Sequence, residues 1–206
     1  MKTASSCILV CLALATLVHA QNIQLLAPQK TGGMPLMEAL NARQTQRTFS
    51  PKPLSEQQLS DLLWAAFGMN RENGKRTAPS AMNRQEIDVY VALSSGLYLY
   101  DAKQNVLTQL SKEDLREKTG KQPFVKIAPV CLIYVSDDER LKLEFYAATD
   151  TGYISQNVYL FCASEGMHTV VLGSVDKEAL HAVMKLKPTQ HVILTQPVGL
   201  PPETAR

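Results

Sequence analysis

Two short stretches decide how this chain is interpreted: A-R-Q-T-Q-R-T-F, residues 42–49, and T-A-P-S-A-M-N-R-Q, residues 77–85. In the first, Arg43 and Arg47 flank Thr45 at the end of a predicted helix. Guanidinium groups can donate paired hydrogen bonds to phosphate oxygens, and the threonine hydroxyl can add another. The second stretch is a Pro-Ser-x-x-Asn turn whose polar groups could border a heterocycle. The first stretch therefore predicts a clamp for an anion.

Each stretch also has an ordinary structural interpretation. Arg43 and Arg47 could be a solvated helix end, because cations suit a helix C-terminus. Ser80 and Asn83 could simply close a turn through their own side chains. The presence of both stretches in one chain, separated by one predicted helix, favours ligand binding over these alternatives.

The residue pattern predicts helices joined to strands that are mainly connected as hairpins. Ser55 and Gln58 form a capping box at the start of one helix, and Gly68 ends it. Helices are expected at residues 35–46, 55–67, 111–118, 138–165 and 176–186, and strands at 87–93, 97–100, 106–110, 130–135, 169–172 and 191–198. This mixture indicates an α+β fold.

Gly152 interrupts the longest predicted helix, where a glycine costs roughly 1 kcal/mol relative to alanine. It could be a tolerated defect. We favour the alternative that a partner helix, a ring system or both pack closely against it.

The first 20 residues have the features of a secretory signal peptide. Lys2 precedes an apolar run from Cys7 to Val18, and Ala20 would end the cleaved segment. Residues 21–206 would then form one exported domain, periplasmic or secreted, and no later run is long enough to span a membrane. Without Lys2 the chain has 20 basic and 19 acidic residues, so neither nucleic acid nor a membrane surface is expected as a partner.

Other residues that often carry chemistry show no matching pattern. The three later histidines, His168, His181 and His191, lack metal-ligand spacing, so no metal site is expected. Cys131 and Cys162 lie in apolar runs and are expected to be small interior residues, although the sequence leaves their pairing open. No nucleophile–base arrangement stands out, so the catalytic residues are unknown.

Both opening stretches resemble the FMN-binding signature of the nitroreductase family, R-[RQ]-[ST]-x-R followed by P-S-x-x-N-x-Q. The resemblance covers residues 35–201 and continues through G-K-Q-P-F-V-K-I-A-P-V (120–130), D-T-G-Y-I-S-Q-N (150–157), G-M-H-T-V-V-L-G-S-V-D (166–176) and Q-P-V-G-L-P (196–201). It implies a nitroreductase-like α+β fold, with a mainly antiparallel central sheet flanked by helices and FMN at a homodimer interface.

The resemblance also assigns roles to individual residues. Flavin phosphate and the polar ring edge would be held by Arg43, Gln44, Thr45 and Arg47, with Arg206 as a second phosphate-binding residue. The turn would reach the flavin of the other subunit through Pro79, Ser80 and Asn83. Lys121 or Gln122 would contact the pyrimidine side of the ring, and the backbone of Leu172, Gly173 and Ser174 would face the reactive nitrogen. Val171 and Gly173 replace a proline and an acidic residue found in many members, which leaves substrate polarity open.

The activity implied by the resemblance is an FMN-dependent oxidoreductase that passes electrons to a small organic acceptor by a ping-pong mechanism. NAD(P)H is the usual family donor but is scarce outside the cytoplasm, so another redox donor is an alternative. The hairpin at residues 96–110 resembles that of azoline-type dehydrogenases, which oxidise their substrate. A further alternative is an exported flavin- or ligand-binding module without turnover.

Overall fold

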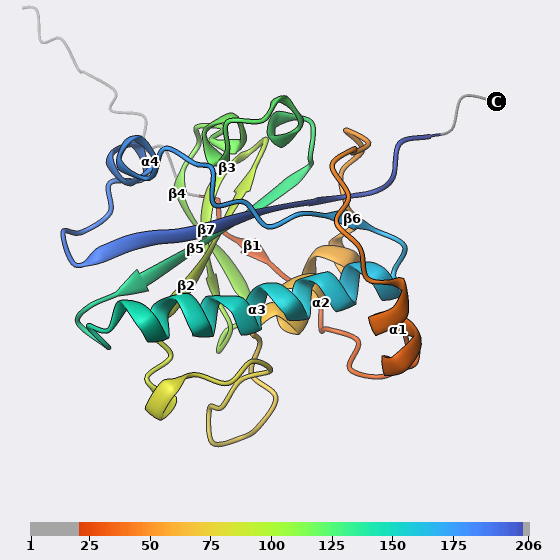
Figure 1. Cartoon of the computed structure of the whole chain (residues 1–206), viewed down its shortest axis with the longest axis horizontal. Coiled ribbons are helices and arrows are strands. Elements are labelled where there is room, and N and C mark those ends of the chain that lie inside the picture. Colours follow the sequence, from red (N-terminus) through yellow and green to blue (C-terminus); the bar gives the residue numbers. More distant parts are fainter. Residues whose placement is uncertain (1–20, 204–206) are drawn as a thin grey trace, which may run out of the picture.

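The computed structural model describes residues 21–203, and these form one seven-stranded antiparallel sheet with helices on both faces (Figure 1). The strand order is β1-β4-β3-β2-β5-β7-β6. The strands are β1 (Ile23–Gln24), β2 (Ile87–Leu93), β3 (Gly96–Asp101), β4 (Val106–Ser111), β5 (Val130–Asp137), β6 (His168–Thr169) and β7 (Gln190–Gly199). The α-helices are α1 (Leu36–Ala42), α2 (Glu56–Phe67), α3 (Glu144–Ser164) and α4 (Lys177–Met184). The predicted α+β class is confirmed.

Strand β5 is the centre of the sheet, and all eight of its residues are buried. Because side chains alternate along a strand, Leu132 and Tyr134 join the core beneath α2 and α3, whereas Cys131 and Ile133 join the core beneath α4. An apolar run without polar alternation is what a strand covered on both faces requires.

The two cysteines are interior residues on opposite faces of this sheet. Cys131 belongs to the α4 side and Cys162, on α3, to the other. Both are free and buried, so they act as small apolar residues and are not placed to pair. Burial raises the pKa of the Cys131 thiol to about 12 and that of Cys162 further still.

The capped starts of two helices, α2 and α4, were predicted correctly. The Ser55 side chain accepts from the Gln58 amide while the Gln58 side chain accepts from the Ser55 amide, which completes the capping box of α2. The Asp176 side chain likewise accepts from the Ala179 amide and starts α4. None of the helices formed by residues 21–203 is long and apolar enough to cross a membrane.

Five predictions about the elements were wrong. The predicted helix at 111–118 is replaced by the end of β4 and a 3₁₀ turn, Arg116–Thr119. The longest helix starts at Glu144, not at 138, because residues 140 and 141 instead turn back to donate to the Asp137 carbonyl. The first helix stops at Ala42, not at 46, because the Gln46 amide pairs with the Thr169 carbonyl. The short strand expected at 169–172 is only His168–Thr169, and β1 was not predicted.

Candidate functional site

The segment Arg43–Arg47 is an exposed stretch that leaves the end of α1 and runs beside β6. A 3.0 Å hydrogen bond from the Gln46 amide to the Thr169 carbonyl joins the segment to β6. The Arg43 guanidinium lies over the ring of Tyr159, 5.4 Å from its centroid. Arg47 is exposed to solvent. Both arginines therefore remain available to an anion, and a tyrosine of α3 supports the first.

Tyr159 also connects the clamp to the segment after β6. Its hydroxyl lies 3.3 Å from the Thr45 hydroxyl and accepts from the Val171 amide at 3.0 Å. The phenol is buried, with 8% of its residue surface exposed. The clamp and residues 171–174, far apart in sequence, are thus held next to each other.

Residues 172–174 form a backbone ledge on the other side of this junction. Leu172 and Thr195 exchange two backbone hydrogen bonds, of 2.7 and 3.1 Å, which anchor the ledge to β7. Gly173 and Ser174 are exposed. The Ser174 carbonyl accepts from the Lys121 amide at 3.2 Å, so the structure brings the predicted pair Lys121 and Gln122 to this ledge.

The Gln122 side chain carries an unusual feature at this place. Its carbonyl oxygen is buried and has no hydrogen-bond partner among residues 21–203. Leaving a buried acceptor unpaired costs about 1–3 kcal/mol, so an external donor at this position would be stabilising. Gly120 packs so closely against Leu172 and Val125 that an added Cβ would lie 2.9 Å from each. The Gln122 carbonyl oxygen lies 3.0 Å from the same added Cβ, so it is packed beside Gly120.

The Pro79–Asn83 turn does not meet the clamp of its own chain. Its Ala81 amide donates to the Asp150 carboxylate at 2.7 Å. Asp150 precedes Tyr159 by nine residues on α3, which separates them by roughly 13 Å along the helix axis. Met82 and Asn83 both have positive φ, of 50° and 53°. Left-handed backbone in non-glycine residues costs free energy and persists where surrounding contacts hold it, so the conformation of this turn depends on its contacts.

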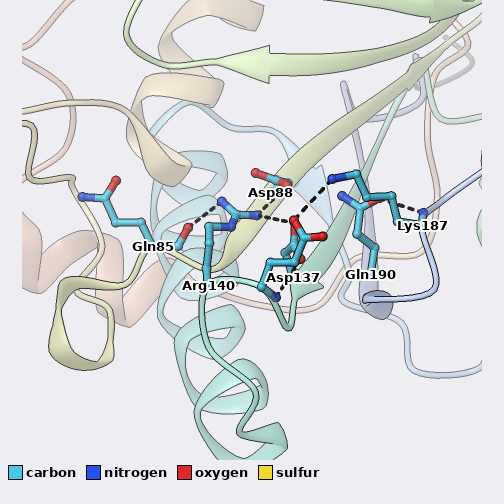
Figure 2. A network of polar contacts seen from close by, with 7 residues as sticks. Gln85, Asp88, Asp137, Arg140, Lys187 and Gln190 are labelled. Carbon is cyan, nitrogen blue, oxygen red and sulfur yellow. Dashed lines mark hydrogen bonds and ion pairs between the residues drawn. The ribbon is translucent and has the colours of Figure 1, made fainter.

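Arg140 fixes the far end of the same turn, as Figure 2 shows. Its guanidinium donates to the Gln85 carbonyl at 2.8 Å and to the Asp88 carboxylate at 2.6 Å. Asp137 lies 4.0 Å away as a second acidic neighbour. The turn is therefore held at its middle by Asp150, and the chain that follows it is held by Arg140.

A buried carboxyl pair lies beneath this turn. Glu86 is fully buried and Asp150 is 2% exposed. Neither carboxylate oxygen of Glu86 has a hydrogen-bond partner within the described residues. Burial, with a smaller contribution from the neighbouring Asp150, raises the pKa of Glu86 to about 7, against the weaker opposing effects of its own backbone amide and of Arg140. A carboxyl in this setting is largely protonated below neutral pH.

Sequence reasoning missed Tyr159, Glu86, Asp150 and Arg140. Asp150 did carry a signal, because a lone acidic residue in an otherwise apolar helical face usually has a specific partner. Tyr159 carried none, since a tyrosine in a helix packs as an ordinary core residue. Arg206, the proposed second phosphate-binding residue, lies outside the described residues.

The hollows of the described chain do not by themselves identify a site. A shallow one of about 190 Å³ lies beside the clamp and is lined in part by Gln44, Gln46 and Tyr159. Another, of about 540 Å³, lies at the other end of α3, where His191 pairs with Asp138 at 3.0 Å. None of the sequence-predicted residues lines it. Within residues 21–203, no group of three or more His, Cys, Asp or Glu side chains is placed to hold a metal.

Comparison with known proteins identifies the fold family. The sequence model of the Nitroreductase family matches residues 40–200. A provisionally named nitroreductase of Methanocaldococcus jannaschii is 29% identical over 180 residues, which cover 80% of this chain and 90% of that protein.

Two crystal structures show the same fold. A provisionally named nitroreductase from Ralstonia eutropha JMP134 has a TM-score of 0.84 and 41% identity, covering 88% of this chain and 90% of its own. A provisionally named nitroreductase from Desulfovibrio desulfuricans, in complex with FMN, has a TM-score of 0.63 and 19% identity, covering 85% of this chain and 92% of its own. Because the family model matches most of this chain, residues 40–200, the chain belongs to the nitroreductase family.

Proposed function

We propose that the protein is an FMN-dependent oxidoreductase. The observation that carries this proposal is the series of hydrogen bonds that links three separate segments, Arg43–Arg47, Leu172–Ser174 and Lys121–Gln122, the last of which carries a buried and unpaired acceptor on Gln122. A flavin ring offers an N–H donor that would pair with this acceptor. Family membership and the FMN complex of the Desulfovibrio relative support the same choice of cofactor.

The residues present fit FMN at both of its ends. Arg43, Thr45 and Arg47 would bind the phosphate through charge-assisted hydrogen bonds. Gln122 would accept from the pyrimidine side of the ring, with Lys121 beside it. The exposed backbone at Gly173 and Ser174 would leave room for the ring to approach. When bound, the flavin supplies the redox chemistry, while the protein supplies position and electrostatics.

We further propose that the working form is a homodimer. Apolar side chains of α1 and α3 are unusually exposed in the single chain: Met37 is 75% exposed and Phe145 is 74% exposed. Leu36 on α1, and Tyr146 and Tyr153 on α3, are also exposed, and exposed large apolar side chains of this kind are typical of an interface. A second copy would also supply the Pro79–Asn83 turn that cannot reach the clamp of its own chain.

Gly152 bears on the same proposal. An added Cβ there would meet no atom of the described chain within 4 Å, so the expected close packing is not made within one chain. A partner helix in the homodimer would account for the glycine.

The remaining features of the proposal follow the family: a small organic acceptor, NAD(P)H or another redox donor, and alternate use of one site in ping-pong order. Residues 1–20 are proposed to direct export, and residues 21–206 to form the exported domain.

The proposal is tested by reconstituting the purified protein with FMN and removing free flavin by gel filtration. Retained absorbance at about 370 and about 450 nm, in a fraction that elutes as a dimer, is the expected result for a bound flavin cofactor. The matched control is the Arg43→Ala, Arg47→Ala double variant, which should elute without flavin. Folded wild-type protein that retains no FMN would overturn the proposal. Bleaching of bound flavin by dithionite but by no biological donor would leave a binding module in place of an enzyme.

A further inference from the structure

We propose that Tyr159 is a positioning residue that holds the Thr45 hydroxyl as a hydrogen-bond donor towards the phosphate of FMN. The inference rests on the proposed function for the presence of that phosphate. It goes beyond it in assigning a role to a helix residue that no binding motif contains. The observations that carry it are the two hydrogen bonds of the Tyr159 hydroxyl and the burial of its ring.

The direction of the hydrogen bonds follows from what each group can do. The Val171 amide can only donate, so the Tyr159 oxygen accepts from it at 3.0 Å. The single hydroxyl hydrogen of Tyr159 is then free for its other neighbour, the Thr45 oxygen at 3.3 Å. Because the phenol has no other acceptor among the described residues, Thr45 is assigned as the acceptor, and its own hydrogen is left to point away from Tyr159.

That direction suits a phosphate. Phosphate oxygens at neutral pH act mainly as acceptors, so the threonine hydroxyl must donate to bind one. Thr45 is exposed, and without the phenol its hydroxyl could rotate freely among water molecules. A chain of hydrogen bonds with one direction, from Val171 through Tyr159 to Thr45, also polarises each member and strengthens the last donor.

The ring of Tyr159 is well placed for such a role because it cannot swing away. It lies on α3, where its sequence neighbour Val158 is fully buried and Cys162, three residues further on, is 1% exposed. The Arg43 guanidinium covers its face at 5.4 Å. One side chain thus supports both a cationic and a hydroxyl member of the clamp.

The experiment compares FMN with riboflavin, which lacks the phosphate. Dissociation constants for both ligands are measured for wild type, Tyr159→Phe, Thr45→Val, the double variant, and Tyr100→Phe as a matched loss of a hydroxyl from a buried tyrosine on β3. Tyr159→Phe is expected to weaken FMN binding roughly 3- to 10-fold, the range of one net hydrogen bond. Riboflavin binding should change little, and Tyr100→Phe should match wild type. In the Thr45→Val background the Tyr159→Phe effect should largely disappear, because contacting residues couple in a double-mutant cycle.

Each outcome separates the inference from its alternatives. Equal loss of FMN and riboflavin would mean that Tyr159 acts only by holding the Val171 backbone, which overturns the inference. Full additivity with Thr45→Val would overturn it as well. Thr45→Ser should restore the preference for FMN without disturbing the core, and its failure to do so counts against the proposal even if Tyr159→Phe proves unstable. If wild type binds neither ligand, the proposed function fails, and the inference falls with it.

Discussion

Replacing Glu86 by glutamine should change how the stability of this protein depends on pH. Glu86 is fully buried beneath the Pro79–Asn83 turn, next to the buried Asp150 of α3. Burial raises its pKa from 4.5 to about 7, because a charged carboxylate at this position loses its hydration and faces a second carboxyl group. The backbone amide of Glu86 and the Arg140 guanidinium oppose the shift without cancelling it. Glutamine keeps nearly the same shape but cannot ionise.

The sign follows from proton binding. Between pH 4.5 and about 7 the folded state holds the Glu86 proton while the unfolded chain has released it. The folded state therefore binds more protons, and the free energy of unfolding must fall as pH rises through this window and level off above it. At about 1.4 kcal/mol for each tenfold change in proton affinity, the loss is on the order of 3 kcal/mol. The figure belongs to the Glu86–Asp150 pair, since the two carboxyl groups interact.

Urea unfolding of wild type and Glu86→Gln at several pH values from about 4 to about 8 would measure this dependence. In the variant, the free energy of unfolding should no longer fall as pH rises from 4.5 to about 7. At about pH 8 the variant should therefore be more stable than wild type. Glu113→Gln, which removes one exposed carboxylate, is the matched control and should keep the wild-type slope. Parallel profiles for wild type and Glu86→Gln would refute the reasoning, because they would show that Glu86 ionises alike in both states.

Two further outcomes are expected. Gly152→Leu should shift the protein from dimer to monomer in gel filtration at micromolar concentration, because the single chain leaves open space there and only a partner would meet the new side chain; an unchanged dimer would place the interface elsewhere. Cys131 and Cys162 should resist thiol reagents in the folded protein and react only on unfolding, since both are 1% exposed or less and burial raises their pKa values; labelled peptides identified by mass spectrometry from native protein would contradict this.

Sequence reasoning succeeded where local chemistry dictates structure. Ser55 and Asp176 started their helices because each side chain satisfies an amide only a few residues away. The apolar run from Val130 to Val135 became the central strand because nothing but burial on both faces accommodates it. The helix proposed for 111–118 failed for the opposite reason: Ser111 does accept from the Glu113 amide, yet its backbone is used by β4 pairing with β3. Long-range strand pairing overrode a local cap.

The candidate site shows the same division. Motifs placed Arg43, Thr45 and Gln122 in segments that the fold brings together, because residues expected to touch a ligand carry recognisable chemistry in short patterns. They could not place the residues beneath those segments. Tyr159 supports the clamp from 114 positions away from Thr45, and Asp150 holds the amide of Ala81 from 69 positions away. Separations of that length leave no pattern in a single sequence.

The supporting residues also explain why one helix matters to two half-sites. Within a chain, α3 carries Tyr159 under the clamp and Asp150 under the turn, roughly 13 Å apart along its axis. If the turn serves the flavin of a second copy, as proposed, then each α3 positions parts of two different sites. A change that displaced α3 would disturb phosphate binding in one site and the ring edge in the other. Gly152 lies between Asp150 and Tyr159 in the sequence of α3, and no atom of the described chain lies within 4 Å of a Cβ added there. At this point α3 has room for close contact with α3 of a second copy. Dimer contact and flavin binding are then properties of the same helix, and variants of its exposed face should alter both together.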